Sequence, residues 1–146
     1  MGYLQAYSEQ RRRSSRTLIK HCDYRSDTAR DAVTALLSLR NPPDSFFVAN
    51  STMALGALEG FDQHGIVPGR DVGLVAFDDA PWARFVNPPM STVRQQAYQI
   101  GASAAEMMLD RIDGRVDDVA PRHLLLPTEL VIRDSSRRKV VASATA

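Results

Sequence analysis

The stretch that decides the fold is residues 71–79, DVGLVAFDD, followed at residues 88–95 by PPMSTVRQ. An apolar, β-branched run that ends at two adjacent carboxylates, Asp78 and Asp79, is typical of a buried strand that ends at the rim of a sheet. In open α/β sheets this rim is where ligands bind. The sequence therefore predicts a polar site at the end of a buried strand.

Strand and helix patterns alternate ahead of this stretch. Strands are predicted at residues 17–22 and 45–49, with helices beginning at about Asp27 and running from about Thr52 to His64. The first helix is expected to be capped by Ser26 or Asp27, and its apolar residues recur at the spacing of one helical stripe: Ala29, Ala32, Val33, Leu36 and Leu37. With a third strand at residues 72–77, three β–α steps favour a parallel sheet with right-handed crossovers. The predicted fold class is α/β, a mostly parallel sheet flanked by helices.

The remainder predicts one long helix and two short strands. Gln96 to Ile112 forms the helix, with Ile100, Ala104 and Met108 on one face. Gly65 and Gly114 stand where left-handed residues end helices. Strands are predicted at residues 123–126 and 129–133, and a frayed polar tail is predicted at residues 135–146.

The N-terminal residues predict an amphipathic helix that begins at Gly2-Tyr3 and runs towards the arginines of residues 11–16. Cations suit the C-terminal end of a helix. Four arginines without interleaved aromatic residues are better explained as a solvated helix end than as a nucleic-acid patch.

Composition narrows the class of protein. The 146 residues are 44% hydrophobic and 24% charged, which describes one globular domain with a workable core. The 18 Lys and Arg balance the 17 Asp and Glu, so the net charge of +1 leaves no general footprint for nucleic acid or membrane. The single Cys22 and the lack of a signal-like apolar segment favour a cytoplasmic location.

Catalytic and metal-binding patterns are missing from the sequence. His21, His64 and His123 are scattered, and none has a ligand spacing with Cys22 or a carboxylate. The sequence contains neither a glycine-rich phosphate loop nor a Gly-x-Ser-x-Gly nucleophile motif. Adjacent carboxylates on an extended strand point to opposite faces, so Asp78 and Asp79 are a poor catalytic pair. We therefore expect no enzyme activity, no cofactor and no metal.

Several ordered motifs resemble the lactose-repressor (LacI/GalR) family of transcription regulators, whose sensor domains have the periplasmic-binding-protein-like type I fold. The motifs are FVAN (47–50), ALGA (54–57), GIVP (65–68), VAFDD (75–79), PPMSTV (88–93) and LPTELV (126–131). They occur in the family order, and together the resemblance covers nearly all of residues 2–136. It implies the C-terminal subdomain of that fold, incomplete at its N-terminus.

The resemblance also implies a division of the chain. Residues 1–134 would be the C-terminal portion of a sensor domain, within which residues 95–126 would partly belong to the otherwise missing N-terminal subdomain. Residues 135–146 would be a disordered tail. A full family member carries a helix-turn-helix ahead of these residues, so the expectation is a truncated or decayed gene product, or a sequence whose start is misassigned.

Asp78 and Asn50 are the first candidate ligand-binding residues. The carboxylate of Asp78 can accept two hydroxyl hydrogen bonds, as neighbouring sugar hydroxyls require, or it can cap the following turn. Asn50 offers a donor and an acceptor, or it can cap the next helix. The resemblance favours ligand contact for both. The Asp that usually follows this Asn in the family is Ser51 here, which weakens any inference about effector class, although Ser51 could cap the helix. Asp79 is expected to cap or pair locally.

Aromatic residues supply the remaining candidates. Tyr24 falls where relatives place an aromatic ring that stacks on a sugar, and it could equally be a packing residue. Trp82 and Phe85 lie in the loop after Asp78 and Asp79, where they would form part of a subunit interface or cover the edge of the pocket.

The resemblance implies the effector sensor of a LacI-type regulator. The effector would be a sugar or nucleobase, DNA would be bound only through the missing N-terminal domain, and the full-length parent would be a homodimer without a membrane partner. The alternatives are a stand-alone dimerisation module, or a decayed fragment without ligand binding, and an α/β enzyme is the weakest interpretation.

Overall fold

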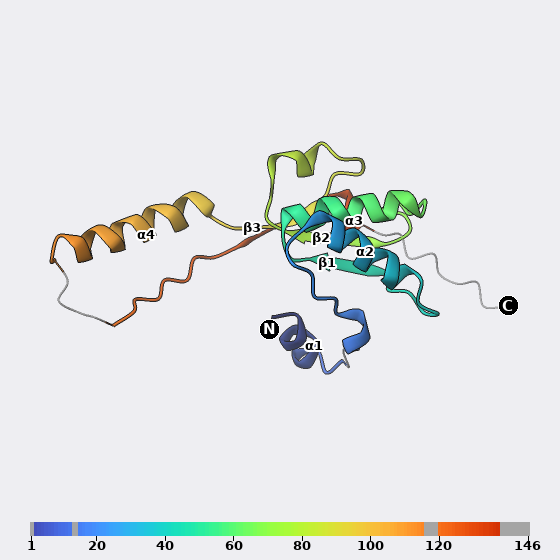
Figure 1. Cartoon of the computed structure of the whole chain (residues 1–146), viewed down its shortest axis with the longest axis horizontal. Helices are drawn as coiled ribbons and strands as arrows, with labels where there is room; N and C mark the ends of the chain where they lie inside the picture. The colour runs from blue at the N-terminus through green and yellow to red at the C-terminus, as the bar shows by residue number, and fades with distance from the viewer. Residues whose placement is uncertain (1, 13–14, 116–119, 138–146) are drawn as a thin grey trace.

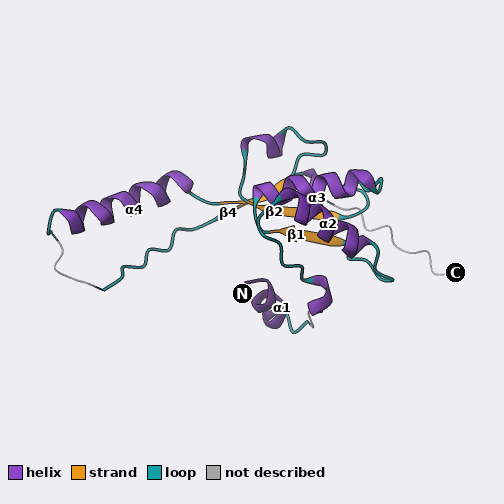
Figure 2. Ribbon diagram, in the orientation of Figure 1, coloured by secondary structure: helices purple, strands orange, loops and turns teal. Residues whose placement is uncertain are grey.

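The protein is described by a computed structural model that covers residues 2–12, 15–115 and 120–137. Its centre is a four-stranded sheet in the order β1-β2-β3-β4. The strands are β1 (Ser45–Val48), β2 (Gly73–Phe77), β3 (Ser91–Arg94) and β4 (Glu129–Val131). β1, β2 and β3 are parallel neighbours, and β4 is antiparallel to β3. Figure 2 shows the strands of the sheet in orange. The predicted mostly parallel α/β fold is confirmed.

Two helices cover one face of this sheet. α2 (Ser26–Leu37) and α3 (Ser51–Gln63) pack against each other, and α3 lies against β1 and β2. Buried and exposed positions alternate along β1, with Phe46 buried and Phe47 exposed, so the other face of this strand is open. The ring of Phe46 meets that of Phe61 edge to face, with centroids 4.9 Å apart. Burial of such apolar surface between sheet and helices is the main force that holds the domain together.

α2 and α3 approach closely at Gly56. A Cβ atom at this position would lie 1.8 Å from the backbone oxygen of Ser26. Only glycine allows the first turn of α2 to lie this close to α3. The contact places the start of α2 against the second turn of α3.

Helix ends agree with the sequence prediction in some places and not in others. Gly65 and Gly114 follow α3 and α4 with φ of +65° each, as predicted. The predicted cap of α2 is wrong: Arg25 is the cap residue and its side chain makes no capping bond. The carboxylate of Asp27 pairs with Arg25 at 2.7 Å and accepts the amide of Thr28 at 3.0 Å, so it acts from within the first turn and not as the cap residue.

α4 (Ala97–Ile112) stands away from the sheet, as Figure 1 shows. β3 leads out to this helix, and the chain returns along it to β4. No residue of α4 is buried. The helix predicted at Gln96–Ile112 is confirmed, and it lies outside the core.

Two predicted strands are absent. Residues 17–22 begin with a 3₁₀ turn, Arg16–Leu18, and continue as irregular chain. Residues 123–126 are extended, but neither segment pairs with a strand of the described chain. Backbone amides and carbonyls form a ladder only where a neighbouring strand lies beside them, which the sequence pattern could not show.

The N-terminal helix, α1 (Gly2–Glu9), is confirmed and has no buried residue. It lies below β1 in the view of Figure 1. Of the arginine-rich turn that follows, residues 13–14 lie outside the described chain. No helix of the described residues is long and apolar enough to cross a membrane.

The disordered tail predicted at residues 135–146 is wrong at its start, because residues 135 and 136 belong to a turn that packs against the sheet. Ser135 lies in a 3₁₀ turn, Asp134–Ser136, and is 1% exposed. Its hydroxyl donates to the carbonyl of Leu74 at 2.7 Å and accepts from the amide of Ser91 at 2.8 Å. This turn is therefore part of the sheet layer, because it fills hydrogen bonds of β2 and β3 that would otherwise be unpaired. Residues 138–146 of the predicted tail lie outside the described residues.

Candidate functional site

Polar side chains follow three neighbouring strands. Asn50 follows β1 by two residues, Asp78 comes directly after β2, and Gln95 comes directly after β3. Because these strands are parallel, their carboxyl ends meet at one edge of the sheet. The sequence predicted polar residues at the ends of two of these strands, Asp78 and Asn50, and the structure adds Gln95 after a third.

Asp78 has an unusual backbone conformation that turns the chain at this edge. Its φ is +75°, a region that Asp and Asn tolerate better than most residues. Its amide donates to the carbonyl of Val93 at 3.0 Å, and the side-chain amide of Gln95 donates to its Oδ1. Within the described chain, Oδ2 of Asp78 accepts no hydrogen bond. One oxygen of this half-buried carboxylate is therefore available to a ligand.

Asp79 is the centre of a separate network. Arg133 donates to both of its oxygens at 2.7 and 3.1 Å, Arg94 donates at 2.6 and 2.9 Å, and the hydroxyl of Thr92 donates at 2.8 Å. The hydrogen bonds from Arg133 above all hold the pKa of Asp79 well below its usual range. The expectation of a local partner for Asp79 is wrong, since β3 and the end of β4 supply its donors. Asp79 is a structural carboxylate that ties three strands together.

Arg94 extends this network to β4. Its guanidinium also lies 3.1 Å from Glu129, which is its register partner on the antiparallel strand. β3 and β4 are the two segments that connect the sheet with α4. We call residues 95–128, which lie between these strands and include α4, the arm. The charges of Arg94 and Glu129 therefore lie at the base of the arm.

Asn50 caps α3. Its Oδ1 accepts a hydrogen bond from the amide of Met53 at 2.7 Å, and its φ and ψ are extended. The capping alternative is confirmed, while Ser51 is the first helical residue and not the cap. Capping occupies only the oxygen, so the side-chain NH₂ of Asn50 remains a donor at the edge.

Tyr24 precedes α2, and its ring is open to solvent. It is 71% exposed and has a φ of +65°. The close approach of Ser26 to Gly56 places the start of α2 against the second turn of α3, the helix that Asn50 caps. Tyr24 is thus not a core packing residue, and it lies two residues before the helix that packs against α3.

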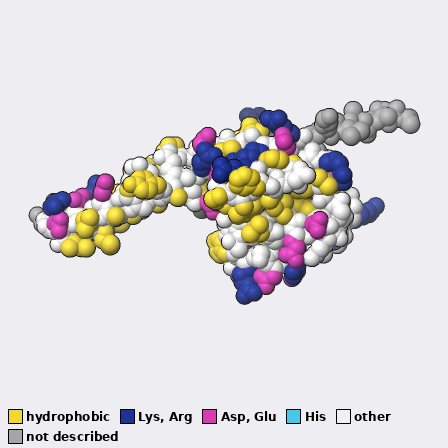
Figure 3. Space-filling view, turned by 90° about the horizontal axis from the view of Figure 1, so that it is seen from above, with side chains coloured by type: hydrophobic (Ala, Val, Ile, Leu, Met, Phe, Trp, Pro, Cys, Tyr) yellow, Lys and Arg dark blue, Asp and Glu magenta, His cyan; other side chains and the backbone are white. Residues whose placement is uncertain are grey.

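Trp82 and Phe85 differ, although the sequence treated them as a pair. Trp82 packs against the core, whereas Phe85 is 74% exposed and carries the guanidinium of Arg84 at 4.7 Å from its ring centroid. Both belong to the loop around the 3₁₀ turn Pro81–Arg84, which projects above α3 in Figure 1. Seen from that side, apolar side chains gather on the rounded part of the molecule (Figure 3).

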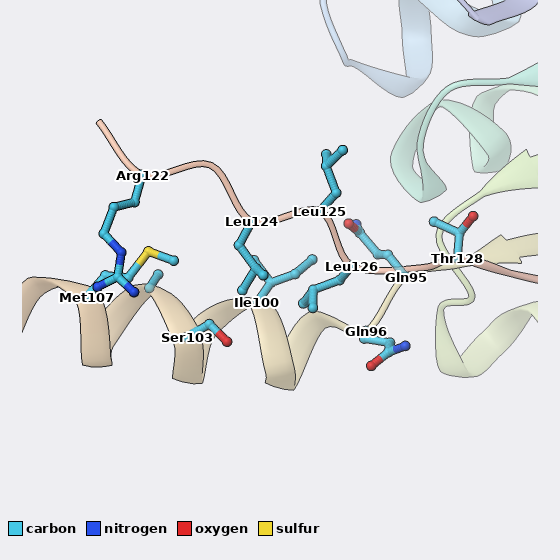
Figure 4. A pocket seen from close by; sticks show the side chains of 11 residues that line it. Gln95, Gln96, Ile100, Ser103, Met107, Arg122, Leu124, Leu125, Leu126 and Thr128 are labelled. Carbon is cyan, nitrogen blue, oxygen red and sulfur yellow. The ribbon is translucent and has the colours of Figure 1, made fainter. Parts of the chain in front are cut away.

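An apolar groove runs between α4 and the returning chain. Figure 4 shows Ile100 and Met107 of α4 opposite Leu124 and Leu126, with Gln95 at the end of the groove nearest the sheet. The three residues predicted to share one face of this helix differ in their surroundings. Ile100 and Ala104 line the groove, whereas Met108 is 62% exposed. The leucines of residues 124–126 form the opposite wall where the sequence predicted a strand.

Gln95 and Arg133 are the residues that sequence reasoning missed at this edge. Gln95 carried a signal, since it follows a strand directly, as Asp78 does. Arg133 carried none, because it meets Asp79 only through the order of strands in the sheet. Within the described residues, no group of three or more His, Cys, Asp or Glu could hold a metal ion.

Comparison with known proteins identifies the class of this domain. Residues 1–136 match the family model of the periplasmic binding protein-like domain, so the chain belongs to that family. It is 36% identical over 113 residues to the lactose operon repressor of Rhizobium radiobacter, covering 77% of this chain and 96% of that one. It is 32% identical over 136 residues to the repressor CytR of Escherichia coli, covering 93% of this chain and 39% of that one.

Solved structures agree with this assignment. The transcriptional regulator CelR in complex with cellobiose has a TM-score of 0.84 and 32% identity, over 92% of this chain and 40% of that one. A LacI regulator from Bacillus cereus subsp. cytotoxis has a TM-score of 0.84 and 27% identity, over 92% and 47%. The chain corresponds to the C-terminal part of the effector-binding domain of LacI-family transcription regulators. It spans less than half the length of CytR and of these two solved chains.

Proposed function

We propose that this chain forms one wall of an effector site, with Asp78, Asn50 and Tyr24 as ligand-binding residues. The observation that carries the proposal is the edge of the sheet. There Asp78 keeps one carboxylate oxygen without a partner in the described chain, and Asn50, after the neighbouring parallel strand, keeps its amide donor. Such polar groups, few and fixed, are what orients a small ligand.

The chemistry of the edge favours a neutral ligand that donates hydrogen bonds. Oδ2 of Asp78 accepts from a hydroxyl or a ring N–H, and the NH₂ of Asn50 donates to an oxygen or a ring nitrogen. The exposed ring of Tyr24 would cover the apolar face of a sugar or a base. A sugar or a purine-like nucleobase meets these requirements. The relative CelR was solved with cellobiose, which supports the sugar class.

The proposed regulation follows from the arm at β3 and β4. In a longer parent protein, a second subdomain would close over the edge, and the two connecting strands would act as the hinge. An effector shifts such an equilibrium only if it binds the two arrangements differently. DNA would be bound through an N-terminal domain, and the regulator would share the cytoplasm with its operator.

Self-association is the second part of the proposal. Phe85 is exposed on the loop after β2, and apolar side chains gather on the face of the molecule seen in Figure 3. Both observations favour a homodimer through an apolar surface of this domain. The same observations favour the alternative function, a stand-alone dimerisation module without an effector. An effector sensor binds a ligand at the edge of the sheet where Asp78 lies, whereas a dimerisation module does not.

Ligand-dependent thermal unfolding separates them. We expect one sugar or purine of a panel to raise the melting temperature of the chain and of an Asp62→Asn control, which changes an exposed carboxylate on α3. Asp78→Asn keeps the positive φ but loses the charge, and should lose the shift. Because these residues offer only one wall, affinity should be about 1 mM at best, or about −4 kcal/mol. A shift that persists in Asp78→Asn would contradict the site.

A further inference from the structure

The ends of β2 and β3 are joined by two consecutive side-chain pairs. Asp79 binds Arg94, and Asp78 binds Gln95. The first pair is charged, and Arg133 reinforces it. The second pair joins a carboxylate to a neutral amide that serves no other side chain of the described chain. The second pair is therefore the simpler of the two links between the candidate site and β3.

Gln95 stands at a junction. It lies between the last residue of β3, Arg94, and the first residue of α4, Ala97. Its side chain faces Asp78 at the edge of the sheet and also lines the near end of the groove between α4 and the returning chain (Figure 4). One of the two connections between the sheet and α4 therefore contains the residue that holds Asp78.

We propose that Gln95 is a positioning residue for effector recognition. By donating to Oδ1, its amide fixes the Asp78 carboxylate and leaves Oδ2 for the ligand, and the same bond links ligand occupancy to the arm of α4. This inference rests on the proposed effector site. The proposed role of Gln95 requires one amide facing one carboxylate. Two carboxylates would repel each other, and two amides would supply no charge for the ligand.

The charged surroundings set the conditions of the test. Asp79 lies beside Asp78 on the same loop, Arg94 lies on β3, Glu129 begins β4, and Arg133 follows the end of that strand. The two arginines are hydrogen-bonded to Asp79, and Arg94 is shared with Glu129. A new carboxylate at position 95 would therefore face Asp78, and both nearby arginines would already be paired with other carboxylates.

The variant Gln95→Glu tests the requirement without a ligand. It places two carboxylates together, so the pKa of the pair is raised in the folded state. Because this pKa is higher in the folded than in the unfolded state, the variant keeps its whole stability below the unfolded-state pKa of about 4.3. It loses stability as the pH rises through the folded-state pKa. In urea unfolding, Gln95→Glu should match wild type at low pH and lose stability towards about pH 7.

Gln96→Glu is the matched control. It makes the same chemical change one residue later, where the side-chain amide reaches the carbonyl of Pro127 at 3.3 Å and not Asp78. Its stability should follow wild type between the same pH values. Equal pH dependence in the two variants would overturn the proposal.

A double variant supplies the rescue. Asp78→Asn with Gln95→Glu restores one amide and one carboxylate with their positions exchanged, so the pH-dependent loss should disappear. Persistence of the loss would show that the carboxylate introduced at position 95 acts on some other group, and would overturn the pairing with Asp78. The double-variant cycle thus measures the pair directly.

Binding of cellobiose, followed by titration in NMR, adds the functional arm. We expect Gln95→Glu to bind about tenfold more weakly than Gln96→Glu near pH 7 and to recover near pH 5. If wild type binds none of the sugars or purines tested, the proposed effector site fails. The unfolding experiments still decide whether Gln95 positions Asp78.

Discussion

Arg133 binds Asp79 through both of its terminal nitrogens, 2.7 Å from Oδ1 and 3.1 Å from Oδ2. The two side chains are 17% and 9% exposed, and they join the end of β4 to the end of β2. A bidentate pair of this kind fixes orientation as well as distance. Because β3 lies between these two strands, the pair holds the middle of the sheet at the edge where the site lies.

Asp79→Asn should therefore destabilise the domain. Removing the charge leaves Arg133 poorly compensated in a mostly buried position, at a cost of about 3 kcal/mol in the free energy of unfolding. Asp31→Asn is the matched control, because it breaks an ion pair with Arg30 in which Asp31 is 69% exposed, and it should cost far less than Asp79→Asn. Urea unfolding near neutral pH measures both. Equal losses would mean that the Asp79 network contributes no more than a surface pair.

The same network predicts acid sensitivity. The pKa of Asp79 is lowered by its hydrogen bonds with Arg133, Arg94 and Thr92, so this carboxylate stabilises the folded state above its unfolded pKa of about 3.9. That contribution is lost as pH falls below this value. The stability difference between wild type and Asp79→Asn should shrink as unfolding is repeated from about pH 6 to about pH 3. A constant difference would assign the loss in the variant to packing and not to charge.

Two substitutions of Asn50 should distinguish its role as the cap of α3 from its proposed role in ligand binding. Asn50→Ala removes the cap of α3 and should cost about 1 kcal/mol of stability. Asn50→Asp keeps the capping oxygen that Met53 uses but replaces the NH₂ donor, so stability should hold while binding of an effector weakens. Thermal unfolding with and without ligand distinguishes the two effects. If Asn50→Asp bound ligand as wild type does, Asn50 would be a cap and nothing more.

The sequence predicted the strands and helices that carry their own pattern and failed where a distant partner decides. The apolar run ending at Asp78 and the capping position of Asn50 could be predicted locally, because strand ends and helix starts have compositional signals. The network around Asp79 could not, since Arg133 lies 54 residues away and reaches it only through the antiparallel pairing of β4. Residues 123–126 have the composition of a strand, yet they pair with none in the described chain.

Gly56 shows how packing overrides helix propensity. Alanine favours helices over glycine by about 1 kcal/mol, but a Cβ at this position would lie 1.8 Å from the oxygen of Ser26. Gly56→Ala should therefore lower the melting temperature by forcing α2 away from α3. Gly101→Ala, on α4, meets nothing within 4 Å and should raise the stability of that helix. Circular dichroism melting of the two variants checks this. A stabilised Gly56→Ala would show that the two helices can separate without cost.

Two apolar surfaces could each mediate self-association, and variants of each surface distinguish them. Phe85 is 74% exposed on the loop after β2, whereas Met108 and Ile112 are exposed on α4 with no described element packed over them. Exposed apolar side chains of this size favour association. We expect concentrated protein to associate by light scattering, and Phe85→Ser to convert a defined dimer to monomer.

Met108→Gln combined with Ile112→Gln should instead suppress only larger species, because α4 offers an open-ended surface and not a face paired by symmetry. Monodisperse monomer for wild type at high concentration would count against both surfaces. A dimer that survives Phe85→Ser but is lost with the α4 variant would move the subunit contact from the sheet domain to the arm. That result would leave the Asp78 edge intact, because Phe85 and α4 can each be changed without touching Asp78 or Asn50.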